Sequence, residues 1–160
     1  MSPEVIRAAS NLLERCRQRG LTLATAESCT GGLIIACLTE IAGSSDVVDR
    51  GFITYSNAAK MEMLGVAEET LDRPGAVSEE VASEMAAGAL AAFKSDWALG
   101  VTGIAGPGGG TKEKPVGLVY IGLARDKFVE VARHEFGGSR HAVKQAAADA
   151  ALAMLWRNLS

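Results

Sequence analysis

The chain is poor in aromatic residues and in histidine. Phe, Trp and Tyr make up 5% of its 160 residues, and the two histidines are His134 and His141. A core with so few rings has to be built from Ala, Val, Leu and Ile. His134 falls in a predicted strand and His141 in the first turn of the last predicted helix, away from the polar loops. A Ser-His-Asp arrangement therefore has little support.

The patterns of metal and disulfide proteins are also missing. Cys16, Cys29 and Cys37 form no CxxC pair, and three cysteines cannot all be disulfide-bonded to one another. We expect a reduced, cytoplasmic protein. Because the sequence holds no HxH motif, no HExxH motif and no cluster of carboxylates, we expect no metal and no cofactor.

Long apolar runs and an excess of basic residues are absent as well. No apolar run approaches the ~20 residues that span a bilayer, and the acid-containing pattern of residues 1–20 is that of an amphipathic helix rather than a signal peptide. The formal net charge is −3. Binding to a membrane is thus not expected, and tight non-specific binding to nucleic acid, which needs clustered Lys and Arg, is unlikely on charge.

What the sequence does contain is an alternation of helical and strand patterns. Hydrophobic periodicity and Gly or Pro stop signals predict helices over residues 3–19, 31–43, 57–64, 78–93 and from 139 onward, and strands over 21–26, 47–55, 97–103, 116–124 and 127–136. Early alternation followed by a hairpin predicts an α/β fold: one domain over residues 1–160, a three-layer α/β/α sandwich with a mixed sheet.

Three polar or Gly-rich segments follow predicted strands: ESCTGG (27–32), YSNAAK (55–60) and TGIAGPGGG (102–110). In open α/β sheets, ligands bind outside the carboxyl ends of the strands. We therefore expect the three segments to converge on one crevice.

The first segment presents Ser28 as a candidate nucleophile. Gly31 and Gly32 allow close approach of a ligand, and the N–H groups of residues 30–32 at the following helix are candidate donors to an anion or oxyanion. The plain alternative is that Ser28 or Thr30 caps that helix. Cys29 is a rival nucleophile, but a thiol normally has a histidine as its base, and none is near.

The second segment adds a candidate base. Lys60 would lie in the first turn of a helix, and Tyr55 would end the strand before it. A desolvated lysine favours its neutral form and can accept a proton from a serine, with Tyr55 orienting groups or transferring a proton. The alternative is an ordinary surface lysine.

The third segment is not a nucleotide phosphate loop, because no Gly precedes Lys112 as GxxxxGK[ST] requires and a strand follows. Thr102 and Gly103 suit contact with a small polar ligand, and the alternative is a flexible connection.

Together AESCTGG, TYSNAAK, GAVSEEVASEMAAGA and TGIAGPGGGTKEKPVGLVYIGLA resemble the CinA C-terminal domain family. The resemblance runs from about residue 4 to the C-terminus. It implies an α/β/α fold, hydrolysis of nicotinamide mononucleotide to nicotinate mononucleotide and ammonia, and therefore a small-molecule nucleotide substrate.

The resemblance also implies roles for single residues. Ser28 would be the nucleophile, Lys60 its base with Tyr55 beside it, and Thr102 would position the substrate. Arg140 would pair with the substrate phosphate. Lys144 stands where many members have a second arginine; it keeps the charge without the bidentate geometry. Glu27 is a candidate to face the positive pyridinium ring.

Two other functions stay open at this point: a non-catalytic, nucleotide-binding regulatory domain, and a protein that contacts DNA. We further expect a homo-oligomer, although the sequence selects neither a dimer nor a trimer.

Overall fold

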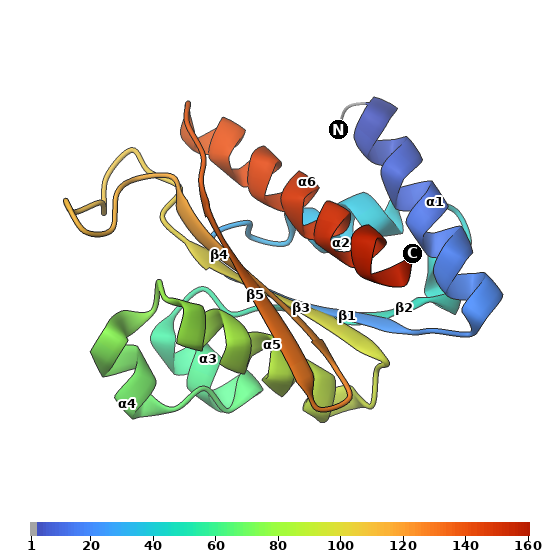
Figure 1. Ribbon diagram of the computed structural model, residues 1–160, viewed down its shortest axis with the longest axis horizontal. Helices are drawn as coiled ribbons and strands as arrows, with labels where there is room; N and C mark the ends of the chain where they lie inside the picture. The colour runs from blue at the N-terminus through green and yellow to red at the C-terminus, as the bar shows by residue number, and fades with distance from the viewer. Residues whose placement is uncertain (1–2) are drawn as a thin grey trace.

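The computed structural model describes residues 3–160 and forms a mixed sheet between two layers of helices. In chain order the elements are α1 (Pro3–Arg19), β1 (Leu23–Glu27), α2 (Leu33–Thr39), η1 (Ser44–Asp46), β2 (Val48–Ile53), α3 (Asn57–Leu64), α4 (Glu68–Thr70), η2 (Leu71–Gly75), α5 (Glu79–Phe93), β3 (Trp97–Gly103), β4 (Leu118–Arg125), β5 (Phe128–Glu135) and α6 (Arg140–Leu159). Helices α1, α2 and α6 cover one face, and α3, α4 and α5 the other (Figure 1).

The sheet has the strand order β2-β1-β3-β4-β5. Strand β1 pairs in parallel with β2 and β3, whereas β4 pairs antiparallel with β3 and β5. The α/β class and the mixed sheet predicted from the sequence are thereby confirmed. Because β1, β2 and β3 run in the same direction, their carboxyl ends meet at one edge of the sheet.

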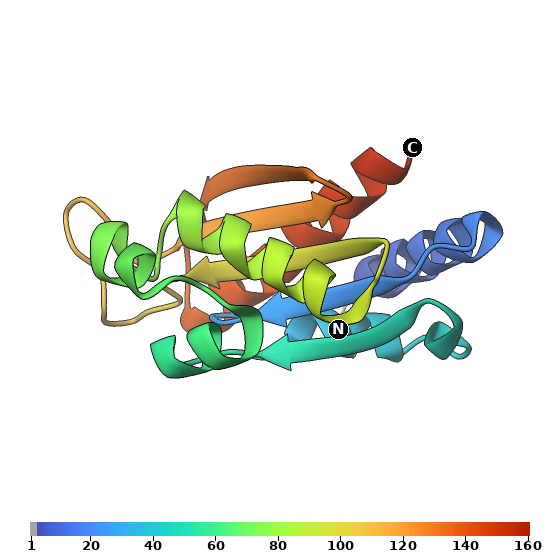
Figure 2. The same ribbon diagram turned by 90° about the horizontal axis from the view of Figure 1, so that it is seen from below.

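The scarcity of aromatic residues is met by close packing of small ones. Gly100 of β3 pairs with Gly122 of β4, and a Cβ on either would lie 2.7 Å or less from the Ala82 carbonyl oxygen of α5. The Ala-rich helix α5 can therefore lie directly on the sheet, as Figure 2 shows. Close packing of small residues thus fills this part of the core, where large aromatic rings would fill it in other proteins.

Two hydrophobic clusters stabilise the layers. The larger lies between the sheet and α1, α2 and α6, and includes Leu12, Leu38 and Leu155. The smaller lies under α3 and α5, and includes Leu64 and Met85. Within residues 3–160, no helix is both long and apolar enough to cross a membrane.

The prediction of a helix from residue 31 was wrong at its start. Gly31 and Gly32 precede α2, with φ values of +63° and +93°. These are left-handed conformations, which an α-helix does not contain and which glycine adopts most readily. The two glycines therefore form the turn between β1 and α2.

Candidate active site

A polar cavity of about 290 Å³ lies at the edge where β1, β2 and β3 end. Its lining residues come from the three segments singled out in the sequence, from the turn before α5, and from the start of α6: Ser28, Cys29, Tyr55, Asn57, Lys60, Ala76, Val77, Thr102, Gly103, Ile104, Ala105, Gly106, Gly108, Gly109 and Arg140. The expected convergence is therefore observed. Asn57 and residues 76–77 also line the cavity, although they were given no role in the site from the sequence.

Ser28 and Lys60 are in direct contact at the floor of this cavity. Lys60 Nζ lies 3.0 Å from Ser28 Oγ and 2.8 Å from the Thr54 carbonyl oxygen. The lysine is 1% exposed, and none of the ion pairs in residues 3–160 includes it. Burial lowers the pKa of Lys60, against a smaller opposite effect of Cys29. The neutral amine is thus favoured beside the serine hydroxyl.

The position of Lys60 follows from the local chain path. Ser56 caps α3 by accepting a hydrogen bond from the Ala59 N–H, 3.0 Å away. Helix α3 therefore begins right after β2, and its first turn carries Lys60 back over the sheet edge. There the Thr54 carbonyl oxygen accepts one N–H of the amine, so the buried group is not left without partners.

Cys29 also lines the cavity, but its thiol is poorly disposed to ionise. Burial raises the pKa of Cys29 to about 11, and the neighbouring Glu27 adds to the rise. Because the thiolate is the reactive form of cysteine, this environment favours Ser28 over Cys29 as the nucleophile.

Glu27 has a different position from the one expected. It is 1% exposed and does not line the cavity, so its predicted contact with a pyridinium ring was wrong. Its carboxylate instead accepts hydrogen bonds from the N–H groups of Gly32, Ile34 and Ile35, at 3.1, 3.0 and 2.9 Å. The side chain therefore closes a ring around residues 28–31 and caps α2.

This capping changes which N–H groups remain free. The Gly32 N–H is bound to Glu27 and the Gly31 N–H to the Ser28 carbonyl oxygen, 3.0 Å away. Neither Gly31, Gly32 nor the fully buried Thr30 lines the cavity. The Thr30 hydroxyl has no hydrogen-bond partner among the described residues.

Glu27→Gln is expected to lower the free energy of unfolding by about 1–3 kcal/mol, because an amide offers one acceptor oxygen and turns N–H groups toward backbone N–H groups. Urea denaturation measures the change. Glu40→Gln, at the exposed far end of α2, is the matched control. Equal stability of Glu27→Gln and the parent would contradict the capping role.

Arg140 joins two walls of the site. One guanidinium nitrogen donates to the Gly106 carbonyl oxygen, 2.8 Å away, and the other to the Tyr55 hydroxyl, 2.9 Å away. Tyr55 is otherwise 63% exposed. Arg140 thereby positions both the glycine-rich loop and the tyrosine.

Thr102 has a similar bridging contact. Its hydroxyl donates to the Ala76 carbonyl oxygen at 2.7 Å, which holds the turn before α5 against β3. Gly103 lies at the end of the same strand, where a Cβ would meet the Leu118 carbonyl oxygen at 2.7 Å. Both residues line the cavity as expected.

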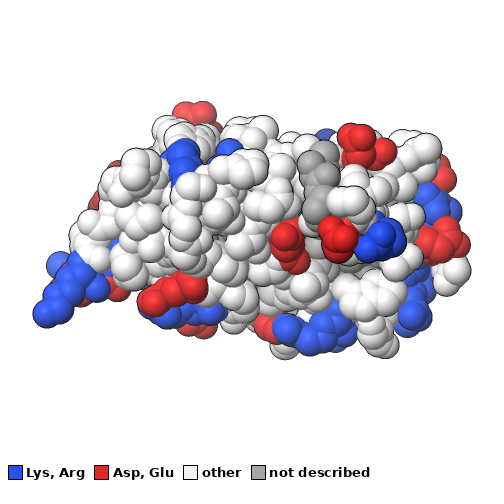
Figure 3. Space-filling view, turned by 90° about the horizontal axis from the view of Figure 1, so that it is seen from above, with Lys and Arg blue, Asp and Glu red and all other residues white. Residues whose placement is uncertain are grey.

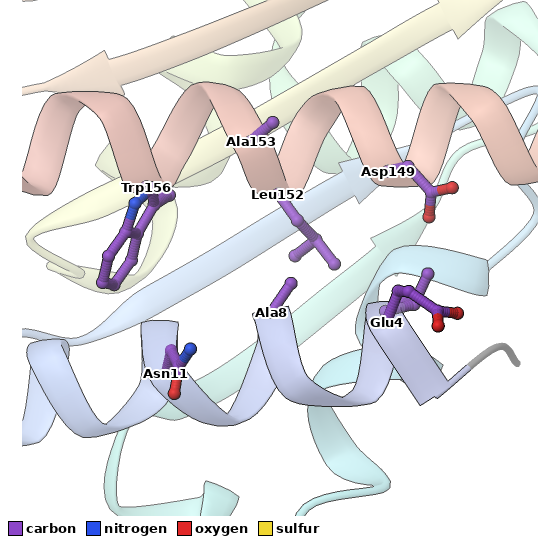
Figure 4. Close-up of a pocket in the computed structure, with 8 residues that line it drawn as sticks. Glu4, Ala8, Asn11, Asp149, Leu152, Ala153 and Trp156 are labelled. Carbon is purple, nitrogen blue, oxygen red and sulfur yellow. The ribbon is translucent and has the colours of Figure 1, made fainter.

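A cavity larger than the candidate active site lies elsewhere. A groove of about 520 Å³ separates α1 from α6. Glu4 and Asp149 stand at one end of this groove, Asn11 and Trp156 at the other, and Ala8 and Leu152 between them (Figure 4). This groove contains no paired nucleophile and base. The smaller cavity that contains Ser28 and Lys60 is therefore the candidate active site.

Among the described residues, no group of three or more His, Cys, Asp or Glu side chains could hold a metal ion. On the face seen in Figure 3, acidic and basic side chains are interspersed rather than gathered into one basic patch.

A buried serine–lysine contact at the carboxyl edge of parallel strands places the molecule among α/β proteins with a candidate nucleophile–base site. Comparison with known sequences identifies the family. The chain belongs to the CinA C-terminal domain family, which it matches over residues 6–159.

Relatives of two lengths are similar to the chain. A protein of Escherichia coli K12 named nicotinamide-nucleotide amidohydrolase PncC is 48% identical over 155 residues, which cover 96% of this chain and 94% of that protein. A CinA-like protein of Syntrophobacter fumaroxidans is 56% identical over 147 residues, 92% of this chain. The chain spans only about a third of that longer relative, 35% of its length.

A solved structure supports the fold. The competence/damage-inducible protein CihA from Agrobacterium tumefaciens superposes with a TM-score of 0.96 at 47% sequence identity. The match covers 98% of this chain and 96% of that one.

Proposed function

We propose that the chain is a nicotinamide-nucleotide amidohydrolase that converts nicotinamide mononucleotide to nicotinate mononucleotide and ammonia through a serine–lysine acyl-transfer mechanism. The observation that carries the mechanism is the 3.0 Å contact between the buried Lys60 Nζ and Ser28 Oγ. The similarity to an amidohydrolase along nearly the whole chain supports the substrate.

The first half of the reaction forms an ester on Ser28. Lys60 takes the hydroxyl proton as Oγ attacks the carboxamide carbon, which gives a tetrahedral oxyanion. The capping by Glu27 leaves the N–H group of Cys29, the one residue of the 29–32 turn that lines the cavity, as the candidate donor to this oxyanion, in place of the expected residues 30–32. The protonated Lys60 then gives its proton to the leaving nitrogen, and ammonia departs.

The second half releases the acid. Lys60, again neutral, takes a proton from a water molecule that attacks the ester carbon, and returns it to Ser28 Oγ as the carbon–oxygen bond breaks. Tyr55, held by Arg140, is the remaining group that can orient the water or the leaving nitrogen. Thr102, Gly103 and Arg140 shape the substrate pocket.

The direct test is ammonia release. We expect the purified protein to convert nicotinamide mononucleotide to one equivalent each of ammonia and nicotinate mononucleotide, in the presence of a metal chelator. Product is identified by chromatography and ammonia by a coupled enzymatic assay. Binding of the nucleotide without turnover would contradict the proposal and favour a regulatory domain instead.

A further inference from the structure

The glycine-rich loop, residues 104–117 between β3 and β4, forms one wall of the cavity. Two backbone hydrogen bonds close the neck of this loop, from the Ile104 N–H to the Leu118 carbonyl oxygen at 2.9 Å and from the Gly117 N–H to the Ile104 carbonyl oxygen at 2.7 Å. Beyond the neck the loop extends past the sheet on the side where α4 lies (Figure 1). The shape of the cavity therefore depends on what holds the outer part of the loop.

Two side-chain hydrogen bonds hold that outer part. Among the described residues, the hydrogen bonds that link residues 106–114 to other elements are those of Arg140 with Gly106 and of Lys114 with Pro74. Lys114 Nζ lies 2.7 Å from the Pro74 carbonyl oxygen. Because Pro74 belongs to η2, this bond connects the loop to the turn before α5.

The turn that Lys114 reaches forms another wall of the cavity. Residues 76–77 of this turn line the cavity. The Thr102 hydroxyl donates to the Ala76 carbonyl oxygen, which fixes the turn on β3, and the Ser78 side chain caps α5 directly after it. The turn is thus held by the sheet and by the helix, and it gives Lys114 a fixed point of attachment.

The contact between Lys114 and Pro74 can open without disturbing the core. Lys114 is half-buried and Pro74 is exposed, and none of the ion pairs in residues 3–160 includes the lysine. Hydrogen bonds near the surface break and re-form in local motions that leave buried elements in place. The glycines of residues 106–110 give the chain the backbone freedom that such a motion needs.

The size of the cavity favours enclosure of a ligand by this loop. Its volume of about 290 Å³ is near the lower end of the ~300–1,000 Å³ found for pockets that bind ligands of drug size. A mononucleotide would fill it, with residues 106–109 against the bound molecule.

We propose that Lys114 is a positioning residue that acts as a latch. Its bond to Pro74 keeps the glycine-rich loop closed against the bound substrate, and release of this bond lets substrate enter and product leave. The inference rests on the proposed function. Lys114 itself is outside the lining of the cavity, so its effect on the reaction passes through the loop.

Lys114→Met is expected to raise KM for nicotinamide mononucleotide by about tenfold or more, the usual effect of losing a hydrogen bond to a charged group. Apparent affinity falls with the fraction of molecules whose loop is closed. Saturating substrate draws the loop closed again, so the single-turnover rate at saturation should stay within about threefold of the parent. Steady-state and single-turnover assays of ammonia release measure the two quantities.

Two variants separate the latch from a general effect of charge. Lys114→Arg can still donate to the Pro74 carbonyl oxygen and should keep KM within about threefold of the parent. Lys112→Met removes an exposed lysine of the same loop that makes no side-chain contact in the described structure, and it should leave KM and kcat unchanged. If Lys114→Met left KM unchanged, or lowered the single-turnover rate instead, the latch would be overturned.

Proteolysis reports the closed loop without reference to activity. Trypsin can cut after Lys112 but not after Lys114, which precedes Pro115, so Lys114→Met keeps the same cleavage site. Cleavage after Lys112, followed by mass spectrometry, should be faster in Lys114→Met than in the parent. In the parent, saturating nicotinate mononucleotide should slow this cleavage by about tenfold. Equal rates with and without the bound product would contradict a closing loop.

The two readouts keep this inference distinct from the amidohydrolase proposal. If Lys114→Met were cut faster after Lys112 but the parent released no ammonia, the latch would stand and the proposed function would fail. If the parent hydrolysed the mononucleotide while Lys114→Met kept its KM and its rate of cleavage, the function would stand and the latch would fail.

Discussion

Ser28→Ala is expected to reduce ammonia release from nicotinamide mononucleotide by at least about 10³-fold. The variant keeps the cavity and the Glu27 cap, and it removes only the oxygen that lies against the Lys60 amine. Loss of a nucleophile from a unit of nucleophile and base removes most of the catalysis that the unit provides. Steady-state kcat measured by the coupled ammonia assay gives the result, with a thermal melt to show that the fold is retained.

Two variants show whether the effect belongs to Ser28. Ser10→Ala, on the exposed face of α1, removes a hydroxyl that does not line the cavity and should retain full activity. Cys29→Ala removes the neighbouring thiol, whose pKa burial raises to about 11. If activity survived in Ser28→Ala and disappeared in Cys29→Ala, the nucleophile would be the thiol.

The meeting of the three polar segments could be predicted from the sequence because it depends on strand direction alone. Once residues 21–26, 47–55 and 97–103 are parallel strands, the chain after each of them must emerge at the same edge. Ser28, Tyr55 and Thr102 each fall within two residues of such a strand end. The location of the site could therefore be predicted from the sequence alone.

The hydrogen bonds inside the site could not be predicted in the same way. Whether Glu27 faces a ligand or accepts N–H groups from residues 32–35 depends on the left-handed conformations of Gly31 and Gly32. These decide where the chain goes after residue 30. A sequence indicates that glycines permit such a turn, but not which side chain the turn encloses.

Arg140 illustrates a second kind of limit. The sequence indicates a cation near the start of the last helix, but its partners, Gly106 and Tyr55, lie 34 and 85 residues away in the chain. Such a contact depends on the path of the 104–117 loop, which has no periodic pattern to read. The burial of Lys60 is similar, because it follows from the placement of α3 over the end of β2.

Lys60→Met is expected to lower kcat by about 10²- to 10⁴-fold, the usual range for loss of a general base, while the protein stays folded. Methionine has nearly the volume of lysine and no charge, so it suits a residue that is 1% exposed. Lys60→Arg should be equally inactive, because a guanidinium group does not release a proton at neutral pH. Ammonia release and thermal melts on the three proteins make the comparison.

The pH dependence tests the protonation state of the amine directly. Activity of the parent should rise with pH as Lys60 loses its proton, and this rise should lie below the 10.5 of a free lysine because burial lowers the Lys60 pKa. In the same window the unfolded chain binds more protons than the folded one, so the stability of the parent relative to Lys60→Met should also increase with pH and level off above 10.5. If a single amine both limits catalysis and carries the cost of burial, the stability rise should begin at the midpoint of the activity curve, because both then report the pKa of Lys60 in the folded protein. An activity rise without a matching stability rise would assign the titration to a different group, and the serine would then need another base.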